Sequence, residues 1–371
     1  MKIGITCYPT YGGSGVVATE LGKQLAQRDN IIHFIASALP YRLDRLDNQI
    51  HFHEVEAMNY PLFEYVPYSL ALATKMVEVA QSAGLDLLHV HYAIPHSISA
   101  FLAREMMAPD RLPIITTLHG TDITLVGKDH SYLPITRFGI QRSDGVTAVS
   151  NYLREATYRE FNIDTDIRVI PNFVDTVAFS RKPSGLFREK FAPRGEKILV
   201  HLSNFRPLKR ITDAVEVVAR MAPEMPVVLL MVGDGVERSR AEHLARERKI
   251  HDRVFFVGKS DEVAEILSDS DLMLLPSELE SFGLAALEAM ACEVPVVATD
   301  AGGIPELVVD GECGALCSIG DVGAMARRAL EILGDPARHQ AMGKNARRRA
   351  VTYSSDLVIP QYEQYYREVL G

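Results

Sequence analysis

The sequence has 371 residues, of which 47% are hydrophobic and 23% are charged, and its formal net charge is −9. This length is typical of two domains, and this composition is typical of a soluble globular protein, which excludes a largely disordered chain. The acidic balance argues against binding to nucleic acid or to an anionic membrane surface, because both need clustered Lys and Arg.

The longest apolar runs are far shorter than the ~18 residues of a membrane helix, so no stable membrane insertion is expected. The apolar stretch after Lys2 ends at Pro9 and is typical of a first strand rather than of a signal peptide. The four cysteines form no C-x-x-C pair, which favours reduced thiols. We therefore expect a cytoplasmic protein, and the sequence leaves a homo-oligomer open.

Short β-branched runs alternate with segments of helical period along the chain. The predicted strands are Lys2 to Cys7, Ile31 to Ala36, Leu87 to Val90, Ile114 to Leu118 and Gly145 to Val149, then Lys197 to Leu202, Val227 to Val232, Arg253 to Val257, Leu272 to Leu275 and Pro295 to Thr299. Helical stretches include Val16 to Arg28, Tyr68 to Ala83, Ser97 to Met107, Ile211 to Met221, Arg238 to Arg248 and Leu284 to Ala291. This alternation predicts an α/β fold of two Rossmann-like parallel-sheet domains. We place them at residues 1–178 and 179–356, and expect a C-terminal helix, 357–371, to cross back to the first domain.

Ligands bind outside the carboxyl ends of the strands in such sheets, so motifs that follow strands carry the most weight. The first strand leads through Gly12, Gly13, Ser14 and Gly15 directly into a helix. Glycines leave backbone N–H groups open at a helix N-terminus, which favours an anion such as a diphosphate. A tight turn without a ligand is the alternative.

The clearest motif lies in the second domain, where residues 276–284 follow a strand and open a helix. Phe282, Gly283 and Leu284 would present backbone N–H groups to phosphate oxygens. Glu280 and Glu288 are little more than two helical turns apart, and their carboxylates suit the paired hydroxyls of a ribose or a hexose. The alternative is that neither glutamate binds a ligand: one would only interact with the helix dipole, and the other would be a solvated surface residue.

Two further segments follow strands. Arg206 and Lys209 lie after Leu202, where cations could neutralise a departing diphosphate, although a basic surface cluster is the alternative. His119 follows Leu118 beside a glycine, which allows close approach to a ligand, although a lone histidine is often structural.

Other patterns are given no functional role. His89 and His91 alternate on one strand but have no third ligand near them in sequence, so no metal site is predicted. The acidic patterns at 164–166 and 269–271 lie at turns between helix and strand, where Asp and Ser are ordinary cap and turn residues.

These motifs occur in an order that resembles the retaining GT-B glycosyltransferases of family 4 over nearly the full length. They are the glycine-rich first loop, H-G-T at His119, S-N-F-R-P-L-K from Ser203, V-G-D-G from Val232, and the pair Glu280 and Glu288. The resemblance implies the GT-B architecture, two Rossmann-like domains that face a central cleft. It also implies an acceptor-binding first domain, a second domain that binds a nucleotide sugar, and the crossover helix.

Asn204 stands where the family usually has an arginine, with Arg206 two residues later. This variant, together with I-T-C-Y-P-T-Y-G-G-S-G, A-L-P-Y-R-L, H-Y-A-I-P-H and H-G-T-D-I-T, is similar to one subgroup, the N-acetylglucosaminyl L-malate synthases. That similarity implies transfer of N-acetylglucosamine from UDP-GlcNAc to the hydroxyl of L-malate with retained configuration. The reaction is the first step of bacillithiol biosynthesis. No cofactor and no metal are implied.

The resemblance also implies roles for individual residues. Those that would bind the nucleotide sugar are Gly13, Asn204, Arg206, Lys209, Gly258, Glu280, Phe282, Gly283, Leu284 and Glu288. Those that would act in catalysis are His119, Glu280, Arg206 and Lys209, and those that would bind the acceptor are Ser14, Tyr92, Thr121 and Arg137.

Three other functions remain open. The first is a family-4 transferase with another acceptor, such as an inositol phosphate, a lipid or a polysaccharide. The second is an enzyme like the UDP-GlcNAc 2-epimerases, and the third is a sensor of nucleotide sugars without catalysis. The fold supports all of them, so only the site residues can distinguish them.

Overall fold

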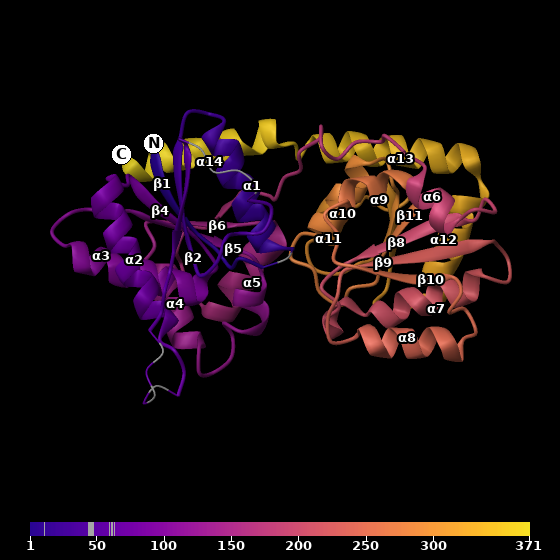
Figure 1. The fold of residues 1–371 in the computed structure, drawn as a ribbon, viewed down its shortest axis with the longest axis horizontal. Helices are drawn as coiled ribbons and strands as arrows, with labels where there is room; N and C mark the ends of the chain where they lie inside the picture. The colour runs from indigo at the N-terminus through magenta and orange to yellow at the C-terminus, as the bar shows by residue number, and fades with distance from the viewer. Residues whose placement is uncertain (11, 44–47, 59, 61, 63) are drawn as a thin grey trace. The chain divides into compact units, whose positions relative to one another are not determined.

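The computed structural model describes residues 1–371 except 11, 44–47, 59, 61 and 63, so Tyr11 of the first-loop motif lies outside the described residues. The chain divides into two compact units, which are described separately. Unit 1 comprises Met1–Asn172 and Asp356–Gly371, and unit 2 comprises Phe173–Ser355. In each unit, helices surround a parallel sheet (Figure 1), which confirms the predicted pair of Rossmann-like folds.

Unit 1 has a seven-stranded sheet in the order β3-β2-β1-β4-β5-β6-β7, and its strand pairs are parallel. The strands are β1 (Lys2–Thr6), β2 (Ile31–Ala36), β3 (Ile50–Glu54), β4 (Leu87–His91), β5 (Ile114–Leu118), β6 (Gly145–Ala148) and β7 (Arg168–Val169). The connecting helices are α1 (Ser14–Ala26), α2 (Tyr68–Ala83), α3 (Ile98–Met107), α4 (Leu133–Gln141) and α5 (Asn151–Phe161), with the short turns η1 (Ala93–Ser97) and η2 (Thr121–Leu125). The chain order of the strands reverses between β1 and β4.

Unit 2 has a six-stranded parallel sheet in the order β10-β9-β8-β11-β12-β13. The strands are β8 (Lys197–Leu202), β9 (Val227–Val232), β10 (Val254–Gly258), β11 (Leu272–Leu275), β12 (Val296–Thr299) and β13 (Gly314–Cys317). The helices are α6 (Leu186–Phe191), α7 (Ile211–Met221), α8 (Arg238–Glu247), α9 (Val263–Asp269), α10 (Leu284–Ala291), α11 (Ile304–Leu307), α12 (Val322–Gly334) and α13 (Pro336–Val351), with the turn η3 (Pro207–Lys209). Here the strand order reverses between β8 and β11.

Buried apolar side chains explain why these segments fold as they do. Strands β4 and β9 are buried along their whole length, as expected of central strands covered on both faces. One face of α7 lies in the core of unit 2, where Ile211, Val215 and Val218 pack with Leu229 and Met231 of β9. Strands β3, β7 and β13 were not predicted: β3 contains two histidines and is mostly half-buried, β7 has only two half-buried residues, and β13 begins with a glycine.

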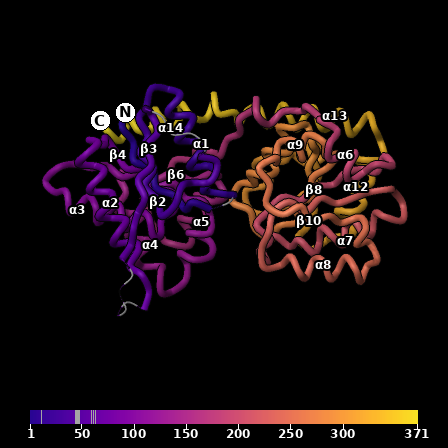
Figure 2. Tube along the Cα trace, viewed as in Figure 1, coloured from indigo at the N-terminus to yellow at the C-terminus, as the bar shows by residue number. Residues whose placement is uncertain are grey.

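The last helix, α14 (Ser355–Leu370), follows unit 2 in the chain but packs on unit 1. It is the yellow helix beside the N-terminal elements in Figures 1 and 2. Tyr362 and Tyr366 are fully buried, and the Tyr365 hydroxyl accepts a hydrogen bond from the backbone N–H of Val146 at 2.9 Å. The helix begins at Ser355, slightly before the predicted 357, because Ser355 and Asp356 are polar residues that favour a first turn. Among the described residues, no helix is both long and apolar enough to cross a bilayer.

A buried hydrogen bond joins α14 to the middle of the sheet. The Tyr366 hydroxyl lies 2.7 Å from His89 Nδ1 on β4, and His89 Nε2 lies 2.7 Å from the Thr117 hydroxyl on β5. Both His89 and Tyr366 are fully buried. Neither ring nitrogen of His89 therefore has access to water as an alternative partner.

We predict that Tyr366→Phe destabilises the protein by ~1–3 kcal/mol, because it leaves His89 Nδ1 buried without a hydrogen-bond partner. Urea unfolding of the full chain measures this loss. Tyr65→Phe is the control, since Tyr65 is 81% exposed. Equal unfolding midpoints for the two variants would show that the Tyr366 hydroxyl contributes nothing.

Candidate functional site

The reversal of strand order determines where loops gather in each unit. Chain connections leave β8 and β11 in opposite directions, so their loops diverge at the carboxyl edge of the sheet, which is where folds of this kind bind ligands. In unit 2 these two loops contain Arg206, Lys209 and Glu280. The sequence motifs therefore lie where a parallel sheet is expected to bind a ligand.

Lys209 and Glu280 form an ion pair at this edge. The Lys209 Nζ lies 2.6 Å from Glu280 Oε1, and the side chains are 17% and 13% exposed. Ser277 donates from its hydroxyl to the same Glu280 oxygen at 2.8 Å, and the backbone N–H of Glu278 donates to Leu208 O at 2.8 Å. The loops after β8 and β11 are thus joined both by side chains and by backbone.

Close backbone contacts fix the position of Glu280. Gly303 N–H donates to Glu280 O at 2.8 Å, and a Cβ on Gly302 would lie 1.9 Å from that oxygen. Gly302 also has φ +63°, so only glycine suits this position. The loop after β12 therefore packs on the backbone of Glu280 and fixes its position.

The loops after β8, β9 and β10 pack together in a similar way. A Cβ on Gly233 would lie 1.9 Å from Ser203 O, and Gly233 N–H donates to Gly258 O at 2.8 Å. Asn204 is exposed beside Gly235 of the V-G-D-G motif. The predicted residues Asn204 and Gly258 thus belong to one group of adjoining loops.

Helix α10 begins at the same edge. Gly283 is its N-cap residue with φ 95°, and no side chain caps the helix or places an acid in its first turn. Its first N–H groups therefore lack intrahelical partners and remain available to an anion. Phe282 packs on the ring of Tyr353, and Glu288 is 5% exposed inside the helix.

The Arg206 side chain is exposed and forms no ion pair with a described residue. It lies three residues before Lys209, at the start of η3. The structure therefore pairs Lys209 with Glu280, whereas the Arg206 side chain forms no ion pair with a described residue.

In unit 1, the first glycine loop also ends at a helix start. Gly13 caps α1 with φ 59° and without a side-chain hydrogen bond, and Ser14 is buried at the first helical position. A Cβ on Gly15 would lie 2.6 Å from Tyr8 O, so the loop packs directly on the helix. The amide of Gly13 lies at the carboxyl edge beside β1, next to the reversal of strand order.

The segments after β4 and β5 meet around Asp122. Its carboxylate accepts hydrogen bonds from the backbone N–H groups of Gly120 at 2.8 Å, His119 at 3.2 Å and Ala93 at 2.9 Å. The ring of His119 packs on that of Tyr92, with centroids 5.4 Å apart, and Thr121 starts η2. Asp122 therefore holds His119, Tyr92 and Thr121 in one group.

Burial keeps the histidines around this group neutral. Desolvation lowers the pKa of His119 to about 3 and that of His96 to about 4, and it lowers the pKa of His91 well below its usual value. A neutral imidazole at His119 can donate one hydrogen bond and accept another, and it carries no charge near neutral pH.

Arg137 lies on α4, and this helix packs closely against the segment after β4. The approach is so close that a Cβ on Gly139 would lie 3.4 Å from Ala93 O. The Arg137 Nε atom is buried without a hydrogen-bond partner, and no described residue forms an ion pair with this side chain. Unpartnered guanidinium donors of this kind suit an anionic ligand.

Several supporting residues were missed by sequence reasoning. Ser277 and Asp122 are polar residues within three positions of Glu280 and His119, and that proximity was the available signal. His91, discounted as a metal ligand, lies 2.8 Å from His119 Nε2 through its Nδ1. Its partner comes from the neighbouring strand, so no local pattern identifies it.

The acidic pattern at 269–271 is structural and lies at the opposite, amino edge of the unit 2 sheet. Asp269 accepts hydrogen bonds from the N–H groups of Gly185 and Phe187 at 3.0 Å each. Asp271 accepts from Ile198 N–H at 2.8 Å and pairs with Arg188 at 3.0 Å. Among the described residues, no group of three or more His, Cys, Asp or Glu is arranged to hold a metal ion.

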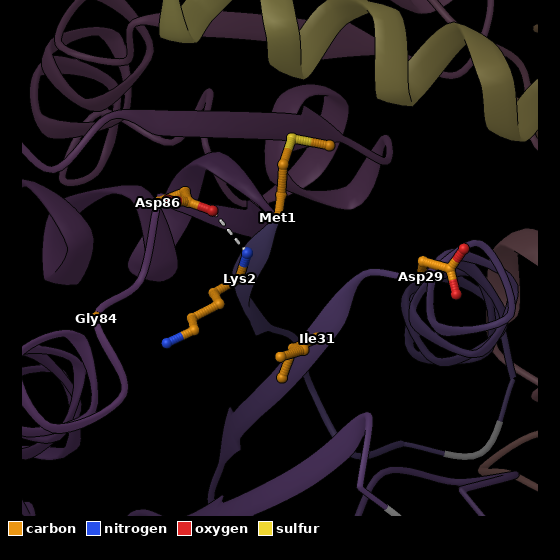
Figure 3. Close-up of a pocket in the computed structure, with 6 residues that line it drawn as sticks. All are labelled: Met1, Lys2, Asp29, Ile31, Gly84 and Asp86. Atoms are coloured by element: carbon orange, nitrogen blue, oxygen red, sulfur yellow. Dashed lines mark hydrogen bonds between the residues drawn. The ribbon is translucent and has the colours of Figure 1, made fainter.

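A hollow of about 420 Å³ opens at the amino edge of the unit 1 sheet, and its walls include Lys2, Ile31 and Asp86. Figure 3 shows that the Lys2 backbone N–H points to Asp86, with which it forms a 2.7 Å hydrogen bond, while its ammonium extends away. The ammonium donates to Ala83 O at 2.7 Å. These groups tie the chain end to the sheet, on the edge opposite the candidate site residues.

The matches to known proteins agree with this geometry. The family model Glycosyltransferase Family 4 matches residues 11–178, and the model Glycosyl transferases group 1 matches residues 185–349. The N-acetyl-alpha-D-glucosaminyl L-malate synthase of Bacillus anthracis is 51% identical, over 100% of this chain and 97% of that protein. The chain belongs to glycosyltransferase family 4.

Solved structures agree with the fold of this family-4 glycosyltransferase. The sucrose-phosphate synthase of Thermosynechococcus elongatus has a TM-score of 0.82 and 25% identity, over 100% of this chain and 99% of that one. HepE of Anabaena, in complex with UDP and glucose, has a TM-score of 0.84 and 21% identity, over 99% of each chain. The predicted GT-B fold is thereby confirmed.

Proposed function

We propose that this glycosyltransferase moves N-acetylglucosamine from UDP-GlcNAc to the hydroxyl of L-malate, with retained α configuration and without a metal. The observation that carries the proposal is the 51% identity, over the full chain, to a protein of Bacillus anthracis named N-acetyl-alpha-D-glucosaminyl L-malate synthase. The arrangement of charged groups at the two carboxyl edges supports it.

In this proposal, residues of unit 2 bind most of the donor. The Lys209 ammonium, Arg206 and the amides of Gly283 and Leu284 neutralise the diphosphate, because cations and helix N-termini can do what a metal does elsewhere. Glu288 accepts hydrogen bonds from the ribose hydroxyls. The remaining contacts come from Asn204 and Phe282 and from the backbone of Gly258, which lies beside the uracil.

The sugar is held by Glu280 and by His119 of unit 1, and the Gly13 amide adds a donor to the diphosphate. The bond from C1 to the diphosphate oxygen breaks as a bond from C1 to the malate hydroxyl oxygen forms on the same face. The proton of that hydroxyl moves to the leaving phosphate oxygen, and UDP departs. Lys209 acts where negative charge develops, which favours an effect on turnover.

The acceptor is bound by unit 1. Malate has two carboxylates, and Arg137 has the forked donor best shaped for one of them. The buried Nε of Arg137, which lacks a partner, supports this role. Ser14, Tyr92 and Thr121 complete the proposed acceptor set.

A product analysis decides between this function and its alternatives. We expect mass spectrometry to detect N-acetylglucosaminyl malate from UDP-GlcNAc and L-malate, with a rate that a metal chelator leaves largely intact. A new nucleotide sugar formed without acceptor would instead indicate an epimerase. Donor binding without turnover on malate, inositol phosphate or oligosaccharide would indicate a sensor, and a rate restored only by divalent ions would contradict the metal-free mechanism.

Two substitutions separate donor binding from bond cleavage. We expect Glu288→Gln to weaken UDP-GlcNAc binding by ~1.5–3 kcal/mol, since it removes a charge-assisted hydrogen bond. We expect Lys209→Ala to lower kcat more than donor affinity. Calorimetry and steady-state kinetics measure both, with Lys344→Ala, an exposed lysine on α13, as the control. Equal and small effects in both variants would refute the assigned roles.

Arg137→Met retains the apolar stem and removes the guanidinium. We expect the KM for malate to rise at least ~10-fold, which corresponds to ~1.4 kcal/mol, while the KM for UDP-GlcNAc barely changes. Arg142→Met, at the C-cap of the same helix, is the control, because the Arg142 guanidinium lies over the Phe138 ring. A malate KM within twofold of wild type, with lower stability, would make Arg137 a structural cation.

A further inference from the structure

Three buried histidines and the partly buried His119 lie around the end of β4, and only His119 has a proposed role. His89, His91 and His96 come from β4 and η1, and His119 follows β5. The rings of His91 and His119 are nearly parallel, with centroids 5.0 Å apart, and His91 Nδ1 lies 2.8 Å from His119 Nε2. One of these two nitrogens must carry the proton of that hydrogen bond.

In His96, the ring nitrogen that is buried without a partner is an unprotonated acceptor. His96 Nδ1 lies 2.6 Å from the carbonyl oxygen of His91, and a carbonyl can only accept. The proton of His96 is therefore on Nδ1. Its Nε2, which is buried without a partner, is then a lone pair and not an N–H group.

The same reasoning applies to His91, whose Nε2 is also buried without a partner. If His119 donated to His91 Nδ1, a neutral His91 would carry its proton on Nε2 and bury an N–H group without an acceptor. Orphaned N–H groups are rarer in proteins than orphaned acceptors. The favoured arrangement therefore has the His91 proton on Nδ1, directed at His119 Nε2.

The other ring nitrogen of His119, Nδ1, remains accessible to a ligand. His119 is only partly buried, and its Nδ1 is neither hydrogen-bonded to a described residue nor among the buried unpartnered atoms. Since Nε2 accepts from His91, a neutral His119 must carry its proton on Nδ1. Backbone contacts to Asp122 and the ring of Tyr92 hold the imidazole in place.

We propose that His91 is a positioning residue that donates to His119 Nε2 and thereby holds His119 in the tautomer with an outward Nδ1–H group. That group is a hydrogen-bond donor, so it selects an oxygen acceptor such as a hydroxyl oxygen of the bound sugar. The consequence for catalysis rests on the proposed role of His119 at the donor sugar. The tautomer itself is a property of the free protein.

The full-length protein labelled with ¹⁵N-histidine tests the tautomer directly in the absence of substrate. Long-range ¹H–¹⁵N spectra report which ring nitrogen is protonated, and His119→Gln identifies the His119 signals by their loss. We expect a protonated Nδ1 and a bare Nε2 at His119 in the wild type. A protonated Nε2 overturns the proposal whatever the activity of the enzyme.

Two variants test the role of His91. His91→Phe retains a ring between His89 and His119 but has no donor, so we expect His119 to shift toward the Nε2–H tautomer and kcat/KM to fall at least ~10-fold. His91→Asn offers an amide N–H near the place of Nδ1 and should restore both the tautomer and most of the activity. The control is His33→Phe, since His33 pairs at 2.9 Å with His53, outside this cluster.

The outcomes separate this inference from the proposed function. An unchanged His119 tautomer in His91→Phe overturns the positioning role. A shifted tautomer with unchanged kcat/KM supports the positioning role and overturns the proposed contact of His119 with the sugar. If His91→Phe does not fold, the wild-type spectrum and His91→Asn still decide.

Discussion

The parallel pairing of the strands is the constraint on which the rest of this structure depends. A parallel strand cannot continue through a tight hairpin, so each connection must return across a face of the sheet before the next strand begins. Every loop that follows a strand is thereby delivered to the same edge. Where the strand order reverses, at β1 and β4 in unit 1 and at β8 and β11 in unit 2, neighbouring loops diverge and leave room for a ligand.

Loops that gather at one edge must also be held there, and glycine backbones allow this. The positions of Gly233 and Gly302 permit one loop to lie directly on the carbonyl of another, at distances that no side chain would tolerate. Backbone hydrogen bonds between these loops also hold the polar groups at the edge, as at the Lys209–Glu280 pair. A rigid arrangement of charged groups before a ligand arrives lowers the reorganisation that binding and catalysis require.

Local sequence signals predicted most of the fold and most of the candidate positions. Buried central strands are continuous apolar runs, and motifs such as the one at Glu280 follow those runs directly, so their place at the carboxyl edge could be inferred. Contacts across strands could not. The register that sets His91 opposite Thr117, and thus brings His91 to His119, depends on the alignment of two strands separated by a helix. Strand β7 has two residues and pairs with β6. Two residues are too few to show the alternation of apolar and polar residues that identifies a strand in a sequence.

The return of α14 to unit 1 has a consequence for synthesis on the ribosome. Unit 2 is continuous in the chain and can fold once Ser355 has emerged, whereas unit 1 lacks α14 until residues 356–371 have emerged as well. Until then the side of the sheet that Tyr362 and Tyr366 cover stays open, and His89 has no tyrosine partner. The usual order, in which the first domain folds first, is therefore reversed for the final packing step. Emergence of α14, rather than of the first half of the chain, sets the moment at which unit 1 closes its core.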